Sequence, residues 1–334
     1  MKKKVSVIIP TYSRALLINR AIKSVLNQSY KNVEIIVVDD NDPSSDDRKN
    51  MELLMKQYEK NEKVIYVKHD KNKNGAAARN TGLRYATGDY VTFLDDDDFY
   101  FEDRIKICVE DLENNKNYKA VYTGCVILEN KKIKKIVQAS KSGNLQMELL
   151  KLNPFFGTGS NMFFDVATLK KLNGFDVSFI RHQDIEVMVR FFDENLIYAE
   201  KEILVAKVEE DRKNFPNIKN SIIYREFFLN SFHDTISQYS KNEIYEIYYK
   251  NYFNLLKLAI RSGSTKYKKD IIKLMKDKKL KIRFKDHLKL FLEKFDRLID
   301  ISSCYRYFRK KVYKKYVIKK ICSECNKMGV KIEK

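Results

Sequence analysis

The segment YVTFLDDDD, residues 90–98, joins a short apolar run to four consecutive aspartates. An apolar run of this length, rich in aromatic and β-branched residues and closed by charged ones, is typical of a buried strand. In open α/β sheets, ligands bind at the carboxyl ends of the parallel strands. The segment therefore predicts a buried strand that delivers an acidic cluster to the ligand-binding edge of a sheet.

The carboxylates of such a cluster repel each other. Two of them about 4 Å apart cost roughly 4 kcal/mol at an effective dielectric near 20, and a divalent cation reverses the sign of that interaction. Mg²⁺ and Mn²⁺ prefer oxygen ligands, and Mg²⁺ often bridges carboxylates to substrate phosphates. On an extended backbone, the side chains of Asp95 and Asp97 point to the same side. We predict a metal and phosphate site at this pair, the alternative being a solvated acidic turn.

Three more apolar runs precede this strand, and segments with helical periodicity separate them. The expected strands are residues 5–9, 34–38, 64–68 and 90–94, and the expected helices are residues 15–28, 44–58 and 76–86. This alternation predicts a parallel sheet wound by right-handed crossovers. Two further strands, 120–128 and 133–138, follow without a helix between them, and a helix is expected over 184–194. We therefore predict an α/β fold with a mixed, mostly parallel sheet between helices.

The charge of the chain is concentrated in its second part. Of the 334 residues, residues 1–216 carry 35 basic and 33 acidic side chains, whereas residues 217–334 carry 30 and 12. All four prolines and eight of the ten glycines lie in the first part, so long helices are expected in the second. We predict an α/β domain over residues 1–216 and a basic α-helical domain over residues 217–334. No apolar run is long enough to span a bilayer.

Three other polar features lie at expected strand ends or helix starts. Asp39 and Asp40 close the second strand, where a carboxylate either binds a base or ribose or caps the next turn. Residues 74–80, NGAAARN, start a helix that either faces an anion, with Arg79 as a neutralising cation, or simply packs small residues closely. Asp184 precedes an amphipathic helix, where an aspartate is usually a cap. No glycine-rich phosphate loop is present.

Taken in order, these segments resemble the family 2 glycosyltransferases of the GT-A fold, over about residues 4–210. The motifs that carry the resemblance are VSVIIPTY (5–12), IIVVDD (35–40), NG (74–75), ARN (78–80), GDYVTFLDDDD (88–98), GSNM (159–162), GFD (174–176) and HQD (182–184) through Arg190. Each motif alone is weak, whereas the ordered series is specific. The sequence departs from the pattern of the family at two places. Residues 41–43 are NDP where the family usually has Gly-Ser, and residue 183 is Gln where the family often has Glu.

The resemblance implies roles for individual residues. The implied contacts of the nucleotide sugar are Pro10, Thr11, Tyr12 and Arg14, Asp40 or Asp39 near the base, Asn74, Gly75 and Arg79 at the helix start, and Asp95 with Asp96 as its neighbour. Asp95 and Asp97 are the implied ligands of Mn²⁺ or Mg²⁺ and of the diphosphate. Asp184 is the implied general base.

The activity implied by the resemblance is metal-dependent inverting transfer of a hexosyl group from a nucleotide-diphosphate sugar. UDP is the most frequent nucleotide of the family, and the expected acceptor is a hydroxyl of a glycan or lipid-linked glycan in surface polysaccharide synthesis, such as capsule or lipopolysaccharide. One rival is a nucleotidyltransferase, which also pairs carboxylates with Mg²⁺ but uses a glycine-rich loop that this chain lacks. Another is a non-catalytic protein that binds membranes or nucleic acid through its basic part.

Residues 266–320 interleave lysines and arginines with bulky apolar side chains. Such a segment either lies on an anionic membrane surface or packs its aromatic residues against the rest of the protein. No secretory signal is recognised and the five cysteines are expected to be reduced thiols. We therefore expect a cytoplasmic enzyme, peripheral on the inner face of the plasma membrane if the first alternative holds. No nucleic-acid partner is expected because no nucleic-acid motif is readable.

Overall fold

The computed structural model describes residues 2–209, 217–296 and 315–332. The chain forms two compact units. The first comprises residues 1–146, 154–212 and 316–334, and the second comprises residues 147–153 and 213–315. The predicted domain boundary near Pro216 lies outside the described residues.

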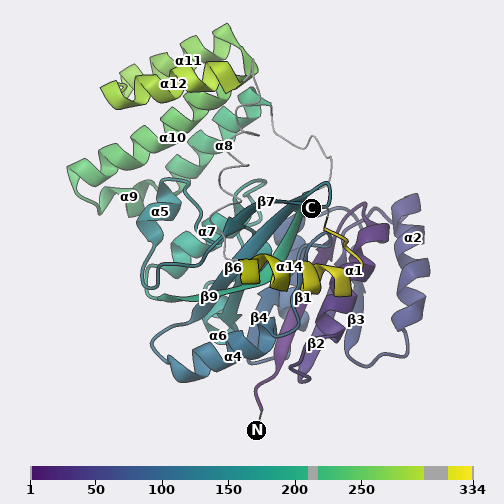
Figure 1. Ribbon diagram of the computed structural model, residues 1–334. Coiled ribbons are helices and arrows are strands. Elements are labelled where there is room, and N and C mark those ends of the chain that lie inside the picture. Colours follow the sequence, from purple (N-terminus) through teal and green to yellow (C-terminus); the bar gives the residue numbers. More distant parts are fainter. Residues whose placement is uncertain (1, 210–216, 297–314, 333–334) are drawn as a thin grey trace. The chain divides into compact units, whose positions relative to one another are not determined.

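The first unit is built on a nine-stranded sheet of the described residues, whose first four strands are parallel (Figure 1). These strands, in spatial order, are β3 (Val64–Lys68), β2 (Val33–Asp39), β1 (Val5–Thr11) and β4 (Tyr90–Phe93). Helices α1 (Ala15–Leu26), α2 (Asp46–Met55) and α3 (Gly75–Tyr85) connect them, with a short turn η1 (Lys56–Tyr58) after α2. Strands β1, β2 and β4 are almost wholly buried, as their apolar runs predict.

Beyond β4 the sheet becomes mixed, which confirms the predicted fold class. Strand β8 (Met162–Asp165) lies antiparallel between β4 and β6 (Ala120–Glu129). Strand β9 (Ile197–Glu209) is parallel to β6 and antiparallel to β5 (Phe99–Tyr100), and β7 (Lys132–Val137) forms a hairpin with β6. The connecting helices of this unit are α4 (Arg104–Asn114), η2 (Gly159–Asn161), α6 (Val166–Lys171) and α7 (Gln183–Phe191), whereas α5 (Gln146–Leu150) belongs, apart from Gln146, to the second unit.

Strand β1 continues through Pro10, although we expected it to end at Ile9. The reason lies in the direction of the backbone groups. The carbonyl of Ile8 accepts the N–H of Leu94 on the β4 side, and the β1–β4 ladder ends at Ile8. The backbone nitrogen of Pro10, two residues later, points to the same side. It lies beyond the end of the β1–β4 ladder, so the strand does not need a hydrogen-bond donor at this position. The strand can therefore pair with β2 as far as Thr11.

The second unit is helical. Its described elements are α8 (Ile218–Ser231), α9 (His233–Ser237), α10 (Lys241–Ser262), α11 (Thr265–Asp277) and α12 (Phe284–Asp296). Helix α10 is the long central element, and it packs against α8, α11 and α12. A capping box of Ser240 and Glu243 starts it, and Gly263 in the left-handed conformation ends it. None of the described helices combines the length and apolar character that a membrane crossing requires.

The last helix, α14 (Lys315–Lys327), belongs to the first unit, although it lies within the range 217–334 of the predicted helical domain. Its Ile321 and Cys325 are buried. Glu324 accepts the backbone N–H of Glu102 at 3.0 Å, and Lys327 pairs with the Glu102 carboxylate at 2.6 Å. The C-terminal helix is thereby fixed beside the loop that follows β5.

Candidate active site

The four aspartates after β4 form a turn, with the N–H of Asp98 donating to the carbonyl of Asp95 at 3.0 Å. We expected an extended backbone here. Asp96 and Asp98 are buried, with 4% and 1% of their surface exposed, whereas Asp95 and Asp97 are partly exposed. The turn therefore separates the cluster into a buried pair, Asp96 and Asp98, and a partly exposed pair, Asp95 and Asp97, which we call the outward pair.

The two buried aspartates are held by neighbouring elements. Oδ2 of Asp96 accepts the hydroxyl of Thr11 at 2.7 Å, and Oδ1 pairs with the guanidinium of Arg14 at 3.0 Å. Oδ2 of Asp98 accepts the hydroxyl of Ser160 at 2.6 Å, and Ser160 Oγ in turn accepts the N–H of Asp95 at 3.0 Å. The cluster is thus tied to the end of β1 and to the loop before β8, which fixes the outward pair in place.

The carboxylates of the cluster raise one another's pKa values. Burial raises the pKa of Asp96 to about 7 against the opposing charge of Arg14. Burial and then the charge of Asp95 raise the pKa of Asp97. The pKa of Asp98 is raised by burial, then by Asp97 and Asp95. Burial, followed by mutual repulsion, therefore disfavours the charged forms of these carboxyl groups, and a bound cation would relieve that cost.

Asp95 and Asp97 offer a donor set of two carboxylates. In residues 2–209, 217–296 and 315–332, no group of three or more His, Cys, Asp or Glu is arranged to hold a metal. Arg14 forms an ion pair with Asp97, and Arg79 forms one with Asp95 at 2.7 Å. Mg²⁺ is commonly bound through one or two carboxylates together with substrate phosphates and water. The pair fits an ion whose coordination is completed by a substrate.

Arg79 joins the acidic cluster to helix α7. Its Nη2 pairs with Asp95, and its Nη1 donates to Oε1 of Gln183 at 3.0 Å. A Cβ at Gly75 would lie 3.0 Å from Nη1 of Arg79 and 3.1 Å from Oε1 of Gln183, so any other residue here would require both ends of this bridge to shift by a few tenths of an ångström. Gln183 is the residue before Asp184, and the bridge therefore holds the start of α7 next to the cluster.

Asp184 lies in the first turn of α7 and is not its N-cap. The N-cap is His182, whose φ of 64° is in the left-handed region. Oδ1 of Asp184 accepts the N–H of Ile185 at 2.9 Å, and a Cβ at Gly159 would lie 3.6 Å from Oδ2. Burial raises the pKa of Asp184, Arg79 lowers it and Asp95 raises it. The charge of Asp184 is thus coupled to Arg79 and to Asp95 of the cluster, and a raised pKa suits a general base.

The two aspartates after β2 differ sharply in their surroundings. Oδ1 of Asp39 accepts the backbone and side-chain N–H groups of Asn41, at 2.9 and 2.8 Å. Its Oδ2 accepts the Tyr66 hydroxyl at 2.5 Å and pairs with Nε of Arg48 at 2.9 Å. Burial and Asp39 together raise the pKa of Tyr66, so its hydroxyl remains a donor. Both oxygens of Asp39 are therefore engaged inside the protein.

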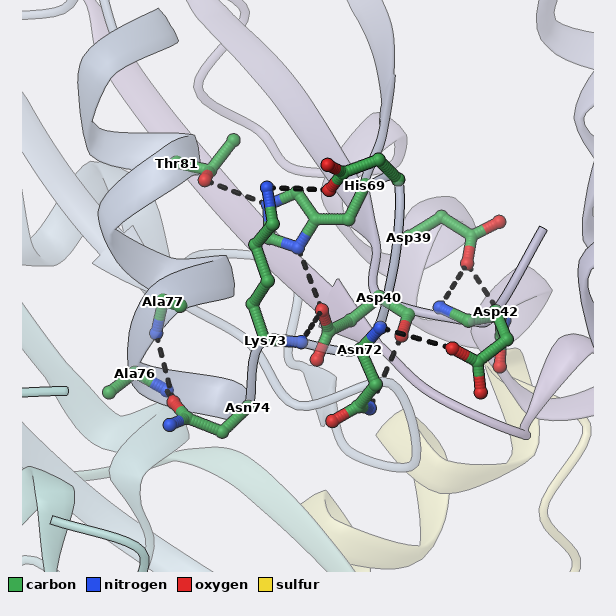
Figure 2. A network of polar contacts seen from close by, with 12 residues as sticks. Asp39, Asp40, Asp42, His69, Asn72, Lys73, Asn74, Ala76, Ala77 and Thr81 are labelled. Atoms are coloured by element: carbon green, nitrogen blue, oxygen red, sulfur yellow. Dashed lines mark hydrogen bonds and ion pairs between the residues drawn. The ribbon is translucent and has the colours of Figure 1, made fainter. Parts of the chain in front are cut away.

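Asp40 has one engaged oxygen and one open one (Figure 2). Its Oδ1 contacts Nδ1 of His69 at 2.7 Å and accepts the N–H of Lys73 at 2.8 Å. No hydrogen bond or ion pair to Oδ2 is made by any residue that the structure describes. Asp40 as a whole is 3% exposed, but Oδ2 is not one of the fully buried polar atoms of the described residues that lack a partner, so this open acceptor reaches the surface at the end of β2.

The remaining predicted contacts of β1 and α1 lie near the same strand ends. Pro10 lies in β1, and Thr11 and Arg14 bond to Asp96 as described. Tyr12 is 50% exposed. Thr11 and Arg14 are thus brought to the acidic cluster, with their polar groups in contact with its carboxylates.

Asn74 is the N-cap of helix α3. Its φ is 76°, and its Oδ1 accepts the N–H groups of Ala76 and Ala77 at 2.9 and 3.1 Å. Its Nδ2 donates to the carbonyl of Val177 at 3.0 Å. The side chain therefore caps α3 and joins its start to the loop before α7, a role that the sequence analysis did not assign.

Three residues of this region were missed from the sequence: Arg48, His69 and Ser160. Arg48 also donates to the carbonyl of His69 at 2.9 Å, which fixes the end of β3. One signal was available for His69, because it directly follows a predicted strand, as Asp39 does. For Ser160 the signal was the GSNM motif. Nothing in the sequence marks Arg48, which lies within an otherwise ordinary surface helix.

A mixed sheet whose parallel strands end at an acidic cluster, with a second carboxylate held beside it, defines a glycosyltransferase of the GT-A class. The family model for glycosyl transferase family 2 matches residues 6–172, half of the chain. The protein belongs to this family.

Two curated relatives are more specific. The chain is 36% identical over 146 residues to the GalNAc(5)-diNAcBac-PP-undecaprenol beta-1,3-glucosyltransferase of Campylobacter jejuni, covering 43% of this chain and 41% of that protein. It is 31% identical over 193 residues to the amylovoran biosynthesis glycosyltransferase AmsB of Erwinia amylovora, covering 55% and 62%. An uncharacterized glycosyltransferase of Rickettsia conorii is 44% identical over 112 residues, but only 18% of its length is spanned.

Solved structures share the fold. S. aureus TarS 1-349 in complex with UDP superposes with a TM-score of 0.50 at 15% identity, covering 93% of both chains. The mannosyltransferase PcManGT of Pyrobaculum calidifontis, in complex with GDP-Man and Mn²⁺, superposes with a TM-score of 0.55 at 19% identity, covering 90% of this chain and 88% of that one. At these identities the likeness concerns the fold alone.

Proposed function

We propose that the protein is an inverting glycosyltransferase that transfers a hexosyl group from a nucleotide-diphosphate sugar, in the first place a UDP-sugar, to a hydroxyl of a glycan or lipid-linked glycan in surface polysaccharide synthesis. The observation that carries this proposal is the bridge made by Arg79. It joins Asp95 of the acidic cluster to Gln183, the residue before Asp184, and this contact supports a shared site for the cluster and Asp184. The names of the C. jejuni and E. amylovora relatives support the acceptor class.

In this proposal Asp95 and Asp97 hold Mn²⁺ or Mg²⁺ together with the donor diphosphate. The ion supplies Lewis-acid neutralisation of the charge that grows on the departing diphosphate. The guanidinium groups of Arg14 and Arg79, now paired with the same carboxylates, supply further positive charge within reach of the phosphates. Thr11 and Asp96 hold the end of β1 against the cluster and thereby position Pro10 and Tyr12 for the nucleotide.

Asp40, rather than Asp39, is the proposed contact of the base. Asp39 has no oxygen left for a ligand, whereas Oδ2 of Asp40 has no partner among the described residues. Asp184 is the proposed general base: it removes the proton of the acceptor hydroxyl while that oxygen attacks the anomeric carbon. This single displacement inverts the anomeric configuration and requires no glycosyl-enzyme intermediate.

A donor screen with ion removal tests the proposal. We expect one class among UDP-, GDP- and dTDP-sugars to be hydrolysed or transferred in the presence of Mn²⁺ or Mg²⁺. Chelation should abolish the reaction, because two carboxylates without an ion repel the diphosphate, and added ion should restore it. Release of pyrophosphate from a nucleoside triphosphate and a sugar phosphate, in place of transfer, would favour the nucleotidyltransferase alternative. No turnover of any donor with either ion would contradict the proposal.

We also propose that the second unit binds an anionic membrane surface. Phe284, Leu288 and Leu292, spaced by one helical turn along α12, are 95%, 63% and 50% exposed. Residues 265–281, around α11, carry eight lysines and two aspartates. Apolar side chains flanked by lysines match the interface of an anionic bilayer, where each nearby lysine contributes about 1 kcal/mol. Residues 297–314 of the basic segment lie outside the described residues.

Vesicle binding of the intact protein tests this second proposal. At physiological salt we expect binding to vesicles that contain phosphatidylglycerol and none to vesicles of phosphatidylcholine alone. Leu288→Ser with Leu292→Ser should weaken binding at least about tenfold, since burial of one such side chain contributes about 1.5–3 kcal/mol. Leu53→Ser removes a leucine of similar exposure from α2 and should change nothing. Equal loss in both variants, or no binding by the wild type, would contradict the proposal.

A further inference from the structure

His69 stands at the end of β3 and is fixed there through its backbone. Its N–H donates to the carbonyl of Asp39 at 2.9 Å, and its own carbonyl accepts Nη2 of Arg48 at 2.9 Å. The residue is 6% exposed. Its ring is therefore buried at the edge where β1, β2 and β3 end, with little freedom to leave that position.

Both ring nitrogens of His69 have partners (Figure 2). Nδ1 lies 2.7 Å from Oδ1 of Asp40, and Nε2 lies 2.8 Å from Oγ1 of Thr81 in α3. Thr81 Oγ1 also accepts a hydrogen bond from Nη2 of Arg84 at 2.8 Å. Because the Thr81 hydroxyl accepts its hydrogen bond from Arg84, its own proton is available for a hydrogen bond to Nε2 of His69. We assign the tautomer with the proton on Nδ1, which donates to Asp40.

We propose that His69 is a positioning residue for the nucleotide. It holds Asp40 by Oδ1, so that Oδ2 is presented as a charged acceptor to an N–H of the base. This inference rests on the proposed function and adds to it a residue and a class of base. A carboxylate accepts but does not donate, so the contact suits bases with a ring N–H on the pairing edge: uracil, thymine and guanine. Cytosine and adenine present an acceptor nitrogen there.

The need for His69 follows from the burial of Asp40. A buried carboxylate is tolerated only when hydrogen bonds replace its lost hydration. Two donors now meet Oδ1, the ring of His69 and the N–H of Lys73. Without the ring, one donor remains, and the carboxylate is free to rotate away from its present orientation. Rotation moves the acceptor at Oδ2 away from the base, while Asp184 and the acidic cluster stay unchanged.

Three variants separate this role from a general effect on folding. His69→Leu removes both ring contacts, whereas in His69→Asn the side-chain amide can replace Nδ1–H as the donor to Asp40. Thr81→Val removes the far anchor of the ring, together with the hydrogen bond from Arg84, and leaves the contact between His69 and Asp40 in place. His233→Leu is the matched control, since His233 is an exposed histidine of the second unit. UDP, GDP, dTDP, CDP and ADP, each with Mn²⁺, serve as the probes in calorimetry.

We expect His69→Leu to weaken binding of the preferred diphosphate about 10- to 100-fold, as for loss of a hydrogen bond to a charged group. The preference over CDP and ADP should shrink by the same factor, and the KM of the donor should rise with little change in kcat. His69→Asn should recover most of the affinity, and Thr81→Val should lose a smaller part of it. His233→Leu should match the wild type.

The inference is overturned if His69→Leu binds the preferred diphosphate as the wild type does. It is overturned equally if the variant only melts at a lower temperature, with affinity and preference unchanged, or if His69→Asn is as weak as His69→Leu. In either case a wild type that binds and turns over a nucleotide sugar leaves the proposed function intact. A wild type that binds none of the five diphosphates rejects the proposed function, and this inference with it.

Discussion

The Asp184→Asn variant is expected to bind the nucleotide sugar with wild-type affinity and to lose about 10²–10⁴-fold of kcat, the usual contribution of a general base. The amide keeps the shape of the side chain and can still accept the N–H of Ile185, so the start of α7 should remain in place. Only the ability to take a proton from the acceptor is lost. Donor binding by calorimetry and initial rates with a fixed acceptor measure the two quantities separately.

The pKa of Asp184 adds a second measurement to this prediction. Burial raises it, so the carboxylate form that a base requires is reached only at a higher pH than for an ordinary aspartate. The rate should therefore fall on the acidic side at a pH above the usual range for Asp, and that limb should vanish in the variant. Glu194→Gln, an exposed carboxylate three residues beyond α7, is the control. Near-normal turnover by Asp184→Asn would remove this residue from the role of base.

Much of the first unit could be predicted from sequence because its information is local. Runs such as IIVV at 35–38 are apolar and β-branched throughout, which in a chain with helical connections indicates a strand buried on both faces. The position of Asp40 and of Asp95 at strand ends follows from the same local pattern. Parallel strands bring their carboxyl ends to one edge of the sheet, so both carboxylates are expected at that edge.

What could not be predicted depends on contacts between distant residues. Asp39 and Asp40 are adjacent and chemically identical, and only the partners Tyr66 and Arg48 show that Asp39 is engaged inside the protein. The bridge from Arg79 to Gln183 joins residues 104 positions apart. Likewise, the turn at residues 95–98 depends on anchors in two other segments. Such contacts are decided by tertiary packing, for which a single sequence carries no signal.

The Asp97→Asn variant is expected to lose about 10²–10³-fold of kcat, the loss typical of removing one group that stabilises developing charge. Its affinity for Mn²⁺ in the presence of the donor diphosphate should also fall, because an amide oxygen is a neutral ligand and the remaining carboxylate, Asp95, is already paired with Arg79. Electron paramagnetic resonance of Mn²⁺ with UDP measures the affinity without turnover. The fold should be retained, since Arg14 keeps its ion pair with Asp96 at 3.0 Å.

A control variant at a nearby carboxylate, Asp103, shows whether the loss in Asp97→Asn is specific to the metal site. Asp103 lies on the same connection, is exposed and accepts the hydroxyl of Ser29 at 2.7 Å, so Asp103→Asn removes a negative charge without touching the outward pair. A general effect of charge on donor binding would lower the activity of both variants to a similar extent. A metal role predicts that only Asp97→Asn requires more Mn²⁺ for half-maximal rate. If both variants keep the wild-type dependence on Mn²⁺, the ion is not held at Asp97.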